Sequence, residues 1–324
     1  MRGTRFHQFG HPAEVLEHAE LPLPEPGPGQ VRIRLLLAPI HNHELSTVRG
    51  QYGFRPSLPA TGGSEACGIV DALGTGVDGH RIGQRVAGAR ILGTWSEYFL
   101  APANLLVPVP DSIDDATACQ LLSMPVSALM LLESLALKPG QWAVQNAANG
   151  AVGKTLALLA RERDMPVIHL VRSATAMAEM KALGIEHVVS SDAADWRETV
   201  RALASDAPIM AVIDSIGGKA SGELLHLLDE GGTLVSFGAL SGEAMQVSPG
   251  DLIFKQATIR GFWASKLSHV NGRSAQQLVG EIIDLALRGA LVLPVDQVFS
   301  LTQIREAAAA ALAGGRKGKV LLRP

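Results

Sequence analysis

The sequence predicts an α/β protein in which a doubly wound parallel sheet follows a smaller, β-rich region. Between residues 141 and 263, apolar segments rich in Val and Ile alternate with amphipathic helical segments, the pattern of a parallel sheet covered on both faces. The first apolar segment runs into a glycine-bearing turn and a helix, as in dinucleotide-binding folds. Before residue 110, short strands separated by Gly and Pro indicate a small barrel-like domain.

The N-terminal region is expected to form strands wherever turn residues bound a β-branched or apolar run. These runs are VRIRLLLAPI (31–40), GIVDALGTGV (68–77), RIGQRVAGAR (81–90) and WSEYFLAP (95–102). Two apolar helices should follow residue 114, the second beginning near Pro125, because the fixed φ of proline suits a first helical turn.

The middle of the chain should then alternate strand and helix. After QWAVQN, strands are expected at 166–171, 187–191, 209–218, 232–240 and 256–263. Helices are expected from Val152, at 174–184, around 193–204 and at 219–232. The remaining helix, short strand, alanine-rich helix and final KVLL strand are too short for a domain and are expected to complete the first one. The expected division is therefore 1–116, 117–263 and a return segment, 264–324.

Composition excludes several classes of function. The net charge of −3 and the absence of a stretch that gathers Lys and Arg on one face argue against a nucleic-acid partner. Two cysteines cannot build a disulfide framework or a four-cysteine zinc site. The sequence has no signal-peptide core and no run near the roughly 20 apolar residues of a membrane span. We therefore expect a cytoplasmic protein with no membrane partner.

The turn AANGAVG fits A-x-G-x-x-G, with Ala148 in place of the first glycine. Gly150 would let the backbone approach a pyrophosphate, and Gly153 would let the helix pack closely on the sheet. The helix N-terminus would add free N–H groups and a positive dipole end. The alternative is an ordinary strand-to-helix turn.

The next strand ends in Arg172 and Ser173, without a carboxylate. NAD sites place an acidic residue there for the ribose 2′-hydroxyl, whereas a guanidinium pairs with a 2′-phosphate. The sequence therefore favours NADPH over NADH, unless Arg172 is simply a solvated residue at a strand end.

Two segments of the β-rich region could carry chemistry. His41 and His43, in HNHE, invite comparison with metal ligands, but an i, i+2 spacing separates side chains on a helix; we expect polar groups of a loop. Tyr52 lies between two glycines in GQYGFRP, and its phenol could donate a hydrogen bond or a proton to a substrate carbonyl. Alternatively, the ring only packs on its loop.

Together these segments resemble the medium-chain dehydrogenase/reductase superfamily, whose GroES-like catalytic domain is interrupted by a Rossmann cofactor domain. VQNAANGAVG, RGQYGFRPSLPATGGSE and IRGFWASKL are most similar to the zinc-free trans-2-enoyl thioester reductases. Zinc-dependent members have Cys and His where this chain has His41 and Ser64, and their four-cysteine lobe is missing. The enoyl reductases have a cofactor-contacting asparagine where this chain has Met124.

The resemblance implies a set of site residues. The family's catalytic tyrosine corresponds to Tyr52, and no metal site is implied. The implied cofactor contacts are Asn149, Gly150, Ala151, Val152, Arg172, Ser173, Ala174, Phe237, Gly238, Ala239, Leu240, Phe262, Trp263, Ala264 and Lys319.

The function implied is a zinc-independent, NADPH-dependent reduction of an activated C=C bond in a small-molecule or carrier-bound acyl substrate, most simply a trans-2-enoyl thioester. An NADPH:quinone oxidoreductase of the same superfamily is the nearest alternative, and a non-enzymatic, crystallin-like NADPH-binding protein is an alternative of another class. Family members commonly dimerise through edge strands. A homodimer is therefore expected, through an unpaired strand near 233–240 or 252–259.

Overall fold

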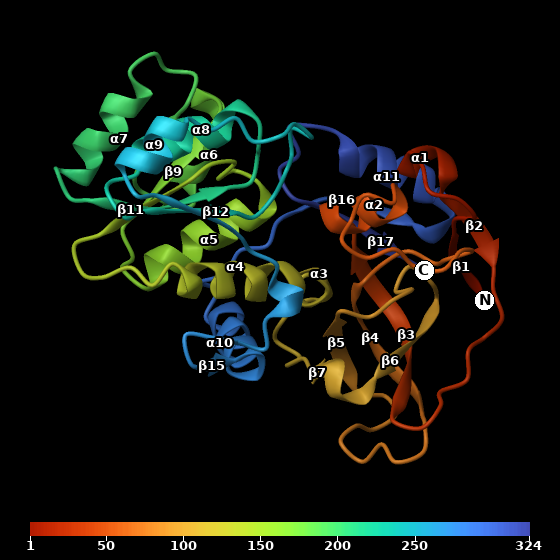
Figure 1. Cartoon of the computed structure of the whole chain (residues 1–324). Helices are drawn as coiled ribbons and strands as arrows, with labels where there is room; N and C mark the ends of the chain where they lie inside the picture. Colours follow the sequence, from red (N-terminus) through yellow and green to blue (C-terminus); the bar gives the residue numbers. More distant parts are fainter. The chain divides into compact units, whose positions relative to one another are not determined.

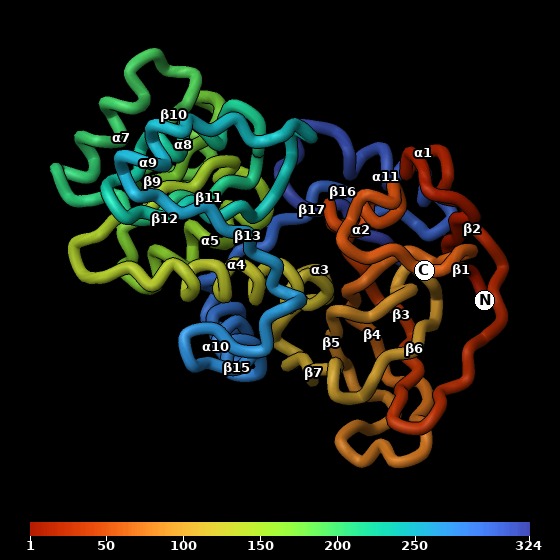
Figure 2. Tube along the Cα trace, viewed as in Figure 1, coloured from red at the N-terminus to blue at the C-terminus, as the bar shows by residue number.

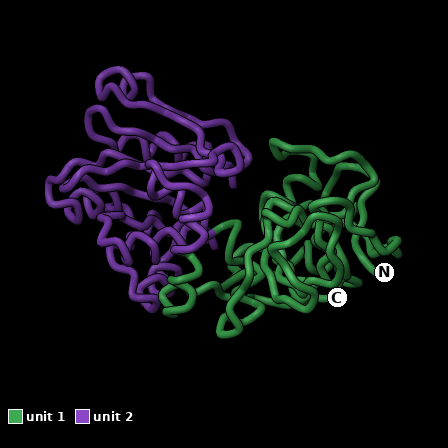
Figure 3. Tube along the Cα trace, turned by 90° about the horizontal axis from the view of Figure 1, so that it is seen from below, with its two compact units in different colours: residues 1–124, 282–324 green, residues 125–281 purple.

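The computed structural model describes residues 1–324 and consists of two compact units. Unit 1 contains Met1–Met124 and Ile282–Pro324, and unit 2 contains Pro125–Glu281 (Figure 3). No helix is long and apolar enough to span a membrane.

Unit 1 is built on a seven-stranded sheet. Its path is β16-β17-β3-β4-β5-β7, with β6 also pairing with β3. The C-terminal strand pairs antiparallel with β3, Leu321 opposite Pro39, so the end of the chain completes the first unit as expected (Figure 2). The strands are β3 (Gln30–Pro39), β4 (Glu65–Leu73), β5 (Arg85–Ala89), β6 (Tyr98–Pro102), β7 (Leu106–Pro108), β16 (Val295–Ser300) and β17 (Lys319–Arg323).

The core of unit 1 forms where this sheet meets helix α11 (Ile304–Leu312). Residues 304, 307, 308 and 311 are all buried, the i, i+3, i+4, i+7 spacing of one apolar helix face. Trp95 is fully buried, and its indole Nε1 donates to the carbonyl of Pro39. The other elements are α1 (Pro12–Val15), α2 (Asn42–Val48), α3 (Asp115–Ala118), the hairpin β1 (Arg2–Arg5) and β2 (Glu17–Glu20), and the short helices η1 (Ala103–Leu105) and η3 (Leu301–Gln303).

Unit 2 confirms the predicted parallel sheet. Six parallel strands have the order β10-β9-β8-β11-β12-β13. The chain first moves outward from β8 to β10 and then returns to the other side of β8, which makes the β8/β11 boundary the topological switch point. The strands are β8 (Trp142–Gln145), β9 (Val167–Val171), β10 (Val188–Ser190), β11 (Ile209–Asp214), β12 (Thr233–Ser236) and β13 (Thr258–Gly261).

Helices cover both faces of this sheet (Figure 1). Along β10, Val188 packs with α5 and α6, whereas Val189 packs with α7 and α8, because successive side chains of a strand alternate between faces. The helices of this part of the chain are α4 (Ser123–Ser134), α5 (Ala151–Glu162), α6 (Ala174–Ala182), α7 (Trp196–Ala204), α8 (Lys219–Leu227), α9 (Pro249–Phe254), η2 (Ala264–Lys266) and α10 (Ala275–Leu287).

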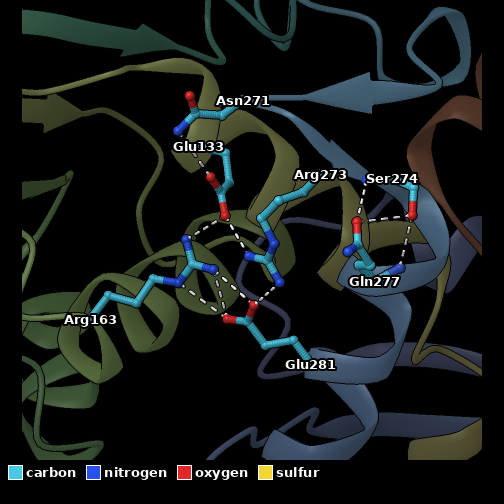
Figure 4. Close-up of polar contacts among 7 residues, drawn as sticks. All are labelled: Glu133, Arg163, Asn271, Arg273, Ser274, Gln277 and Glu281. Carbon is cyan, nitrogen blue, oxygen red and sulfur yellow. Dashed lines mark hydrogen bonds and ion pairs between the residues drawn. The ribbon is translucent and has the colours of Figure 1, made fainter.

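Residues 264–281 differ from the expected division, because they belong to unit 2 rather than to the return segment. An ionic network holds them there (Figure 4). Glu133 of α4 accepts hydrogen bonds from Arg163 and from Arg273, which lies in the short hairpin β14 (His269–Val270) and β15 (Arg273–Ser274). Both arginines also donate to Glu281 of α10.

The expectation that the strand near 233–240 lies unpaired at an edge of the sheet is wrong. Strand β12 lies inside the sheet, paired with β11 on one side and β13 on the other. The free edges are β10 and β13. The sequence does not reveal this because only the pairing of β12 with both β11 and β13 distinguishes an interior strand from an edge strand.

Candidate functional site

The turn between β8 and α5 has the geometry of an anion cradle. Gly150 is the N-cap of α5 and supplies no side-chain cap, so no capping side chain competes for the N–H groups of the first helical turn. A Cβ on Gly150 would meet only the carbonyl oxygen of Ala147, at 3.2 Å. A Cβ on Gly153 would lie 2.6 Å from that oxygen and from the Cα of Ala148. Thus the close approach of α5 to the preceding turn requires a glycine at position 153, and Gly150 leaves the outer side of the turn open.

A buried polar network fixes the strand ends on either side of the switch point. Asn146, after β8, donates to Oδ1 of Asp214 at 2.7 Å and accepts from the backbone N–H of Ser215. Asp214 also accepts from the backbone N–H of Gly217 and from the Ser221 hydroxyl. Sequence reasoning missed this network, because Asn146 and Asp214 become neighbours only when β8 pairs with β11.

The adjacent strand β9 ends at the proposed 2′-phosphate residues. Arg172 is exposed directly after β9, and Ser173 is the N-cap of α6, where its side chain accepts from the N–H of Ala176. Since β9 pairs in parallel with β8, Arg172 and the glycine turn both lie at the carboxyl-end edge of the sheet, where the parallel strands end. Asn149, Ala151, Val152 and Ala174 lie at the starts of α5 and α6 along this edge.

The remaining proposed contacts of unit 2 follow β12 and β13 at the same edge. The backbone N–H of Phe237 donates to the Asp214 carbonyl at 2.8 Å, and a Cβ on Gly238 would lie 2.9 Å from the Ser215 carbonyl oxygen. Phe237 and Phe262 are in ring contact, with centroids 6.0 Å apart. An open depression of about 420 Å³ lies here, lined by Ser236, Arg260, Gly261, Phe262, Trp263, Lys266 and Leu267. Ala239 and Leu240 lie in the loop after β12, and Ala264 is the first residue of η2.

In unit 1, three aromatic rings follow one another beside α2. The His41 and His43 rings are stacked, with centroids 5.1 Å apart and planes at 15°. The His43 ring lies 5.5 Å from the ring of Tyr52. The expectation that these histidines are polar groups of a loop is wrong. His41 is the N-cap of α2, with extended backbone, and only His43 is helical, so helical i, i+2 geometry does not apply to the pair.

Two glutamates surround these rings. Glu44 accepts from the backbone N–H of His41 at 2.7 Å, and from both the backbone N–H and the hydroxyl of Ser64, at 2.6 and 2.7 Å. Glu65 is fully buried; its Oε2 lies 2.7 Å from Nε2 of His41. Its Oε1 accepts from the backbone N–H groups of residues 122 and 123. Glu65 therefore links α2 to the start of α4.

Burial sets the charge state of this cluster. It raises the pKa of Glu44 to about 7 and that of Glu65 to about 8, since a carboxylate loses hydration on burial. For the same reason, burial lowers the pKa of His43 to about 4 and keeps the pKa of His41 well below its ordinary value. Burial also lowers the pKa of Lys319 to about 8, although Glu44 and Glu65 favour its charged form.

Lys319, at the start of β17, thus belongs to the His41–Glu44–Glu65 cluster of unit 1. The pairing of β17 with β3 brings it there, because α2 directly follows β3. The Nε2 atoms of His41 and His43 each lie within hydrogen-bond distance of a side-chain oxygen, Glu65 and Ser64 respectively. No group of three or more His, Cys, Asp or Glu side chains is arranged to hold a metal ion.

A Ser–His–Glu arrangement for nucleophilic catalysis does not fit these residues. In a nucleophilic triad the imidazole lies between the hydroxyl and the carboxylate. Here the Ser64 hydroxyl lies between the His43 imidazole and the Glu44 carboxylate, and it donates to the carboxylate. This order of groups does not activate Ser64 as a nucleophile.

Comparison with known proteins identifies the family. The family model described as the alcohol dehydrogenase GroES-like domain matches residues 27–111, and the one described as zinc-binding dehydrogenase matches residues 151–280. Human mitochondrial enoyl-[acyl-carrier-protein] reductase is 32% identical over 320 residues, covering 96% of this chain and 86% of that protein.

Solved structures agree over the whole chain. Escherichia coli quinone oxidoreductase complexed with NADPH superposes with a TM-score of 0.91 at 25% identity, covering 100% of both chains. Quinone oxidoreductase from Pseudomonas syringae pv. tomato DC3000 superposes with a TM-score of 0.90 at 26% identity, covering 100% of this chain and 99% of that one. The chain therefore belongs to the medium-chain dehydrogenase/reductase superfamily, in the group of oxidoreductases that includes enoyl-acyl-carrier-protein reductases and quinone oxidoreductases.

Proposed function

We propose that this protein is a zinc-independent, NADPH-dependent reductase of an activated C=C bond, with trans-2-enoyl thioesters as its substrate class. The observation that carries the proposal is the open, glycine-lined helix start at the switch point of a parallel sheet, beside the Arg172 end of β9. A dinucleotide with a 2′-phosphate matches this combination of backbone donors and guanidinium. The human enoyl-[acyl-carrier-protein] reductase relative supports the choice of substrate.

NADPH fits the residues present. The first-turn N–H groups of α5 would bind the pyrophosphate, since Gly150 leaves that side of the turn open. Arg172 and Ser173 would bind the 2′-phosphate. Phe262 and Trp263, beside the depression at the ends of β12 and β13, would exclude water from the nicotinamide. Lys319 remains a proposed cofactor contact from the family resemblance alone.

Tyr52 would carry the substrate chemistry. Bound NADPH supplies a hydride for the β-carbon of the enoyl group. Negative charge then develops on the thioester oxygen, and a phenol can stabilise this charge by a hydrogen bond or deliver the proton that the α-carbon requires. Tyr52 is half-buried next to His43, which limits the movement of its ring.

The test of this proposal is NADPH oxidation with a crotonyl thioester, an enone and a 1,4-quinone, in wild type and in two single variants. Tyr52→Phe removes the proposed phenol, and Tyr98→Phe, on β6, is the matched control. We expect Tyr52→Phe to lower kcat for the thioester by roughly 10²–10³-fold and Tyr98→Phe to leave it near wild type. Full activity of Tyr52→Phe would exclude a catalytic role for the Tyr52 phenol.

The same assay separates the rival functions. A quinone oxidoreductase would share the cofactor residues but would not need Tyr52, so quinone reduction that is insensitive to Tyr52→Phe would favour it. If the protein binds NADPH but none of these acceptors oxidises the bound NADPH, the non-enzymatic, crystallin-like function would be favoured.

A homodimer is the proposed assembly. Strand β13 leaves one edge of the sheet unpaired, and unpaired edges favour association. In α9, which precedes this strand, Phe254 is 84% exposed and Ile253 is 59% exposed. Sedimentation of wild type and Phe254→Asp tests this surface: the variant should shift towards monomer, and an unchanged dimer would exclude Phe254 from the interface.

A further inference from the structure

A continuous line of hydrogen bonds connects a buried carboxyl group to the ring beside Tyr52. The Ser64 hydroxyl donates to Oε1 of Glu44 at 2.7 Å and lies 2.9 Å from Nε2 of His43. The ring centroid of His43 is 5.5 Å from that of Tyr52. All four residues lie in unit 1.

The single proton of the Ser64 hydroxyl gives this line a direction. When Glu44 is ionised, Ser64 donates to it and must accept from Nε2–H of His43, so Nδ1 of the neutral imidazole carries no proton. When Glu44 is protonated, it can donate to Ser64, which then donates to Nε2, and Nδ1 carries the proton. Protonation of Glu44 is therefore coupled to the tautomer of His43.

The surroundings allow this coupling near neutral pH. Burial raises the pKa of Glu44 to about 7, partly opposed by its hydrogen bonds and by Lys319, so its carboxyl group holds a proton for a large fraction of the time. Burial and Lys319 keep His43 neutral, as a tautomer exchange requires. His41, Glu65 and Lys319 complete the charged or titratable groups around the cluster.

We propose that Glu44, Ser64 and His43 form a proton relay that returns a proton to Tyr52 in each turnover; this proposal rests on the proposed function. Tyr52 gives its phenolic proton to the α-carbon of the reduced substrate and becomes a phenolate. Nδ1 of His43 then gives its proton to the phenolate, while Nε2 takes the Ser64 proton and Ser64 takes the proton of Glu44. The line ends with an ionised Glu44 and with His43 protonated at Nε2. Uptake of one solvent proton at Nδ1, with transfer of the Nε2 proton to Ser64 and of the Ser64 proton to Glu44, restores the starting state before the next turnover.

The balance of hydrogen is complete in this sequence. The C=C bond gains one hydride and one proton, and the proton comes finally from the carboxyl group of Glu44. His43 and Ser64 each lose and gain one proton, so both return to a neutral state with only their hydrogen-bond direction reversed.

The variants that test the relay are Ser64→Ala, which interrupts it, and Ser64→Thr, which keeps the hydroxyl. Ser64→Ala retains the backbone N–H that also binds Glu44, so the anchoring of the loop is largely preserved. Thr47→Val is the matched control, because the Thr47 hydroxyl binds the backbone carbonyl of His43 on the same helix but lies outside the relay.

The first measurement is the tautomer of His43 against pH, by NMR of protein with isotopically labelled histidine and without substrate. In wild type we expect a change from Nδ1–H to Nε2–H as the pH rises through about 7. Ser64→Ala should abolish the change, and Ser64→Thr should restore it. A tautomer that does not follow pH in wild type, or that follows it equally in Ser64→Ala, would overturn the relay whatever the enzymatic result.

The second measurement is kcat for NADPH oxidation in ordinary and deuterated water. Ser64→Ala should lower kcat by roughly 100-fold, the lower end of the range for acid–base groups, and change the solvent isotope effect. Ser64→Thr should recover most of the activity that Ser64→Ala loses, and Thr47→Val should resemble wild type. A Ser64→Ala enzyme with wild-type kcat would exclude the relay from turnover. A wild-type protein that is inactive with every acceptor would overturn the proposed function alone, and the tautomer measurement would still decide whether the relay exists.

Discussion

Replacing Gly153 with alanine should destabilise unit 2, whereas the same change at Gly150 should mainly weaken cofactor binding. The added methyl group at Gly153 would lie 2.6–2.7 Å from three backbone atoms of Ala147 and Ala148, none of which can rotate away. Overpacking of this kind costs about 1–3 kcal/mol, and the better helix propensity of alanine returns up to about 1 kcal/mol. We expect a net loss of about 1–2 kcal/mol.

At Gly150 the methyl group would meet only one atom, at 3.2 Å, and it would occupy the open side of the turn. We expect a change of stability within about 0.5 kcal/mol, together with at least a roughly 10-fold loss of NADPH affinity, or about 1.4 kcal/mol.

Urea denaturation and NADPH fluorescence titration measure the two effects separately. Gly280→Ala is the control, since this position in α10 has no atom within 4 Å of an added Cβ, and alanine there should stabilise the helix by about 1 kcal/mol. Equal stability of Gly153→Ala and wild type would refute the packing argument. Equal NADPH affinity of Gly150→Ala and wild type would refute the cradle.

Three further predictions concern charged residues. Arg172→Glu should raise the KM for NADPH by roughly 10–100-fold, because a charge-assisted hydrogen bond contributes about 1.5–3 kcal/mol. The KM for NADH should change little. An unchanged ratio of the two KM values would argue against recognition of the 2′-phosphate by Arg172. Glu133→Gln removes one of the two carboxylates that Arg163 and Arg273 share and should lower stability by about 1–3 kcal/mol, seen as a lower urea midpoint. Glu65 has a pKa raised to about 8 by burial, so the folded protein keeps a proton that the unfolded chain loses near its ordinary 4.5. The folded state is therefore favoured by protonation of Glu65 at low pH, and this stabilisation is lost as the pH rises towards 8. Glu65→Gln should therefore gain on wild type between pH 5 and 8, by up to about 5 kcal/mol, and parallel stability–pH curves would contradict the buried, protonated state.

Much of the fold could be predicted from the sequence, because periodicity and turn residues act locally. The strands and helices of unit 2 lie close to their expected positions, and the last strand, β17, returns to the first unit as expected. Residues 264–281 could not be assigned to the correct unit from the sequence. Their place depends on ion pairs of Arg273 and Glu281 with residues more than a hundred positions earlier in the chain.

The candidate site could be predicted only in part. The turn at Gly150 and the strand end at Arg172 are local signals. The Asn146–Asp214 network depends on strand order, and the His41–His43 stack depends on the position at which α2 begins. The charge state of Glu44 depends on burial beside Ser64 and Lys319. Neither spacing nor residue type carries that information.

The most direct test of the account is a matrix of initial rates, with a crotonyl thioester and a 1,4-quinone as acceptors and NADPH and NADH as donors. We expect the highest kcat/KM for NADPH with the enoyl thioester, and loss of that rate in Tyr52→Phe but not in Tyr98→Phe. A preference for NADH, or reduction of the quinone alone, would contradict it.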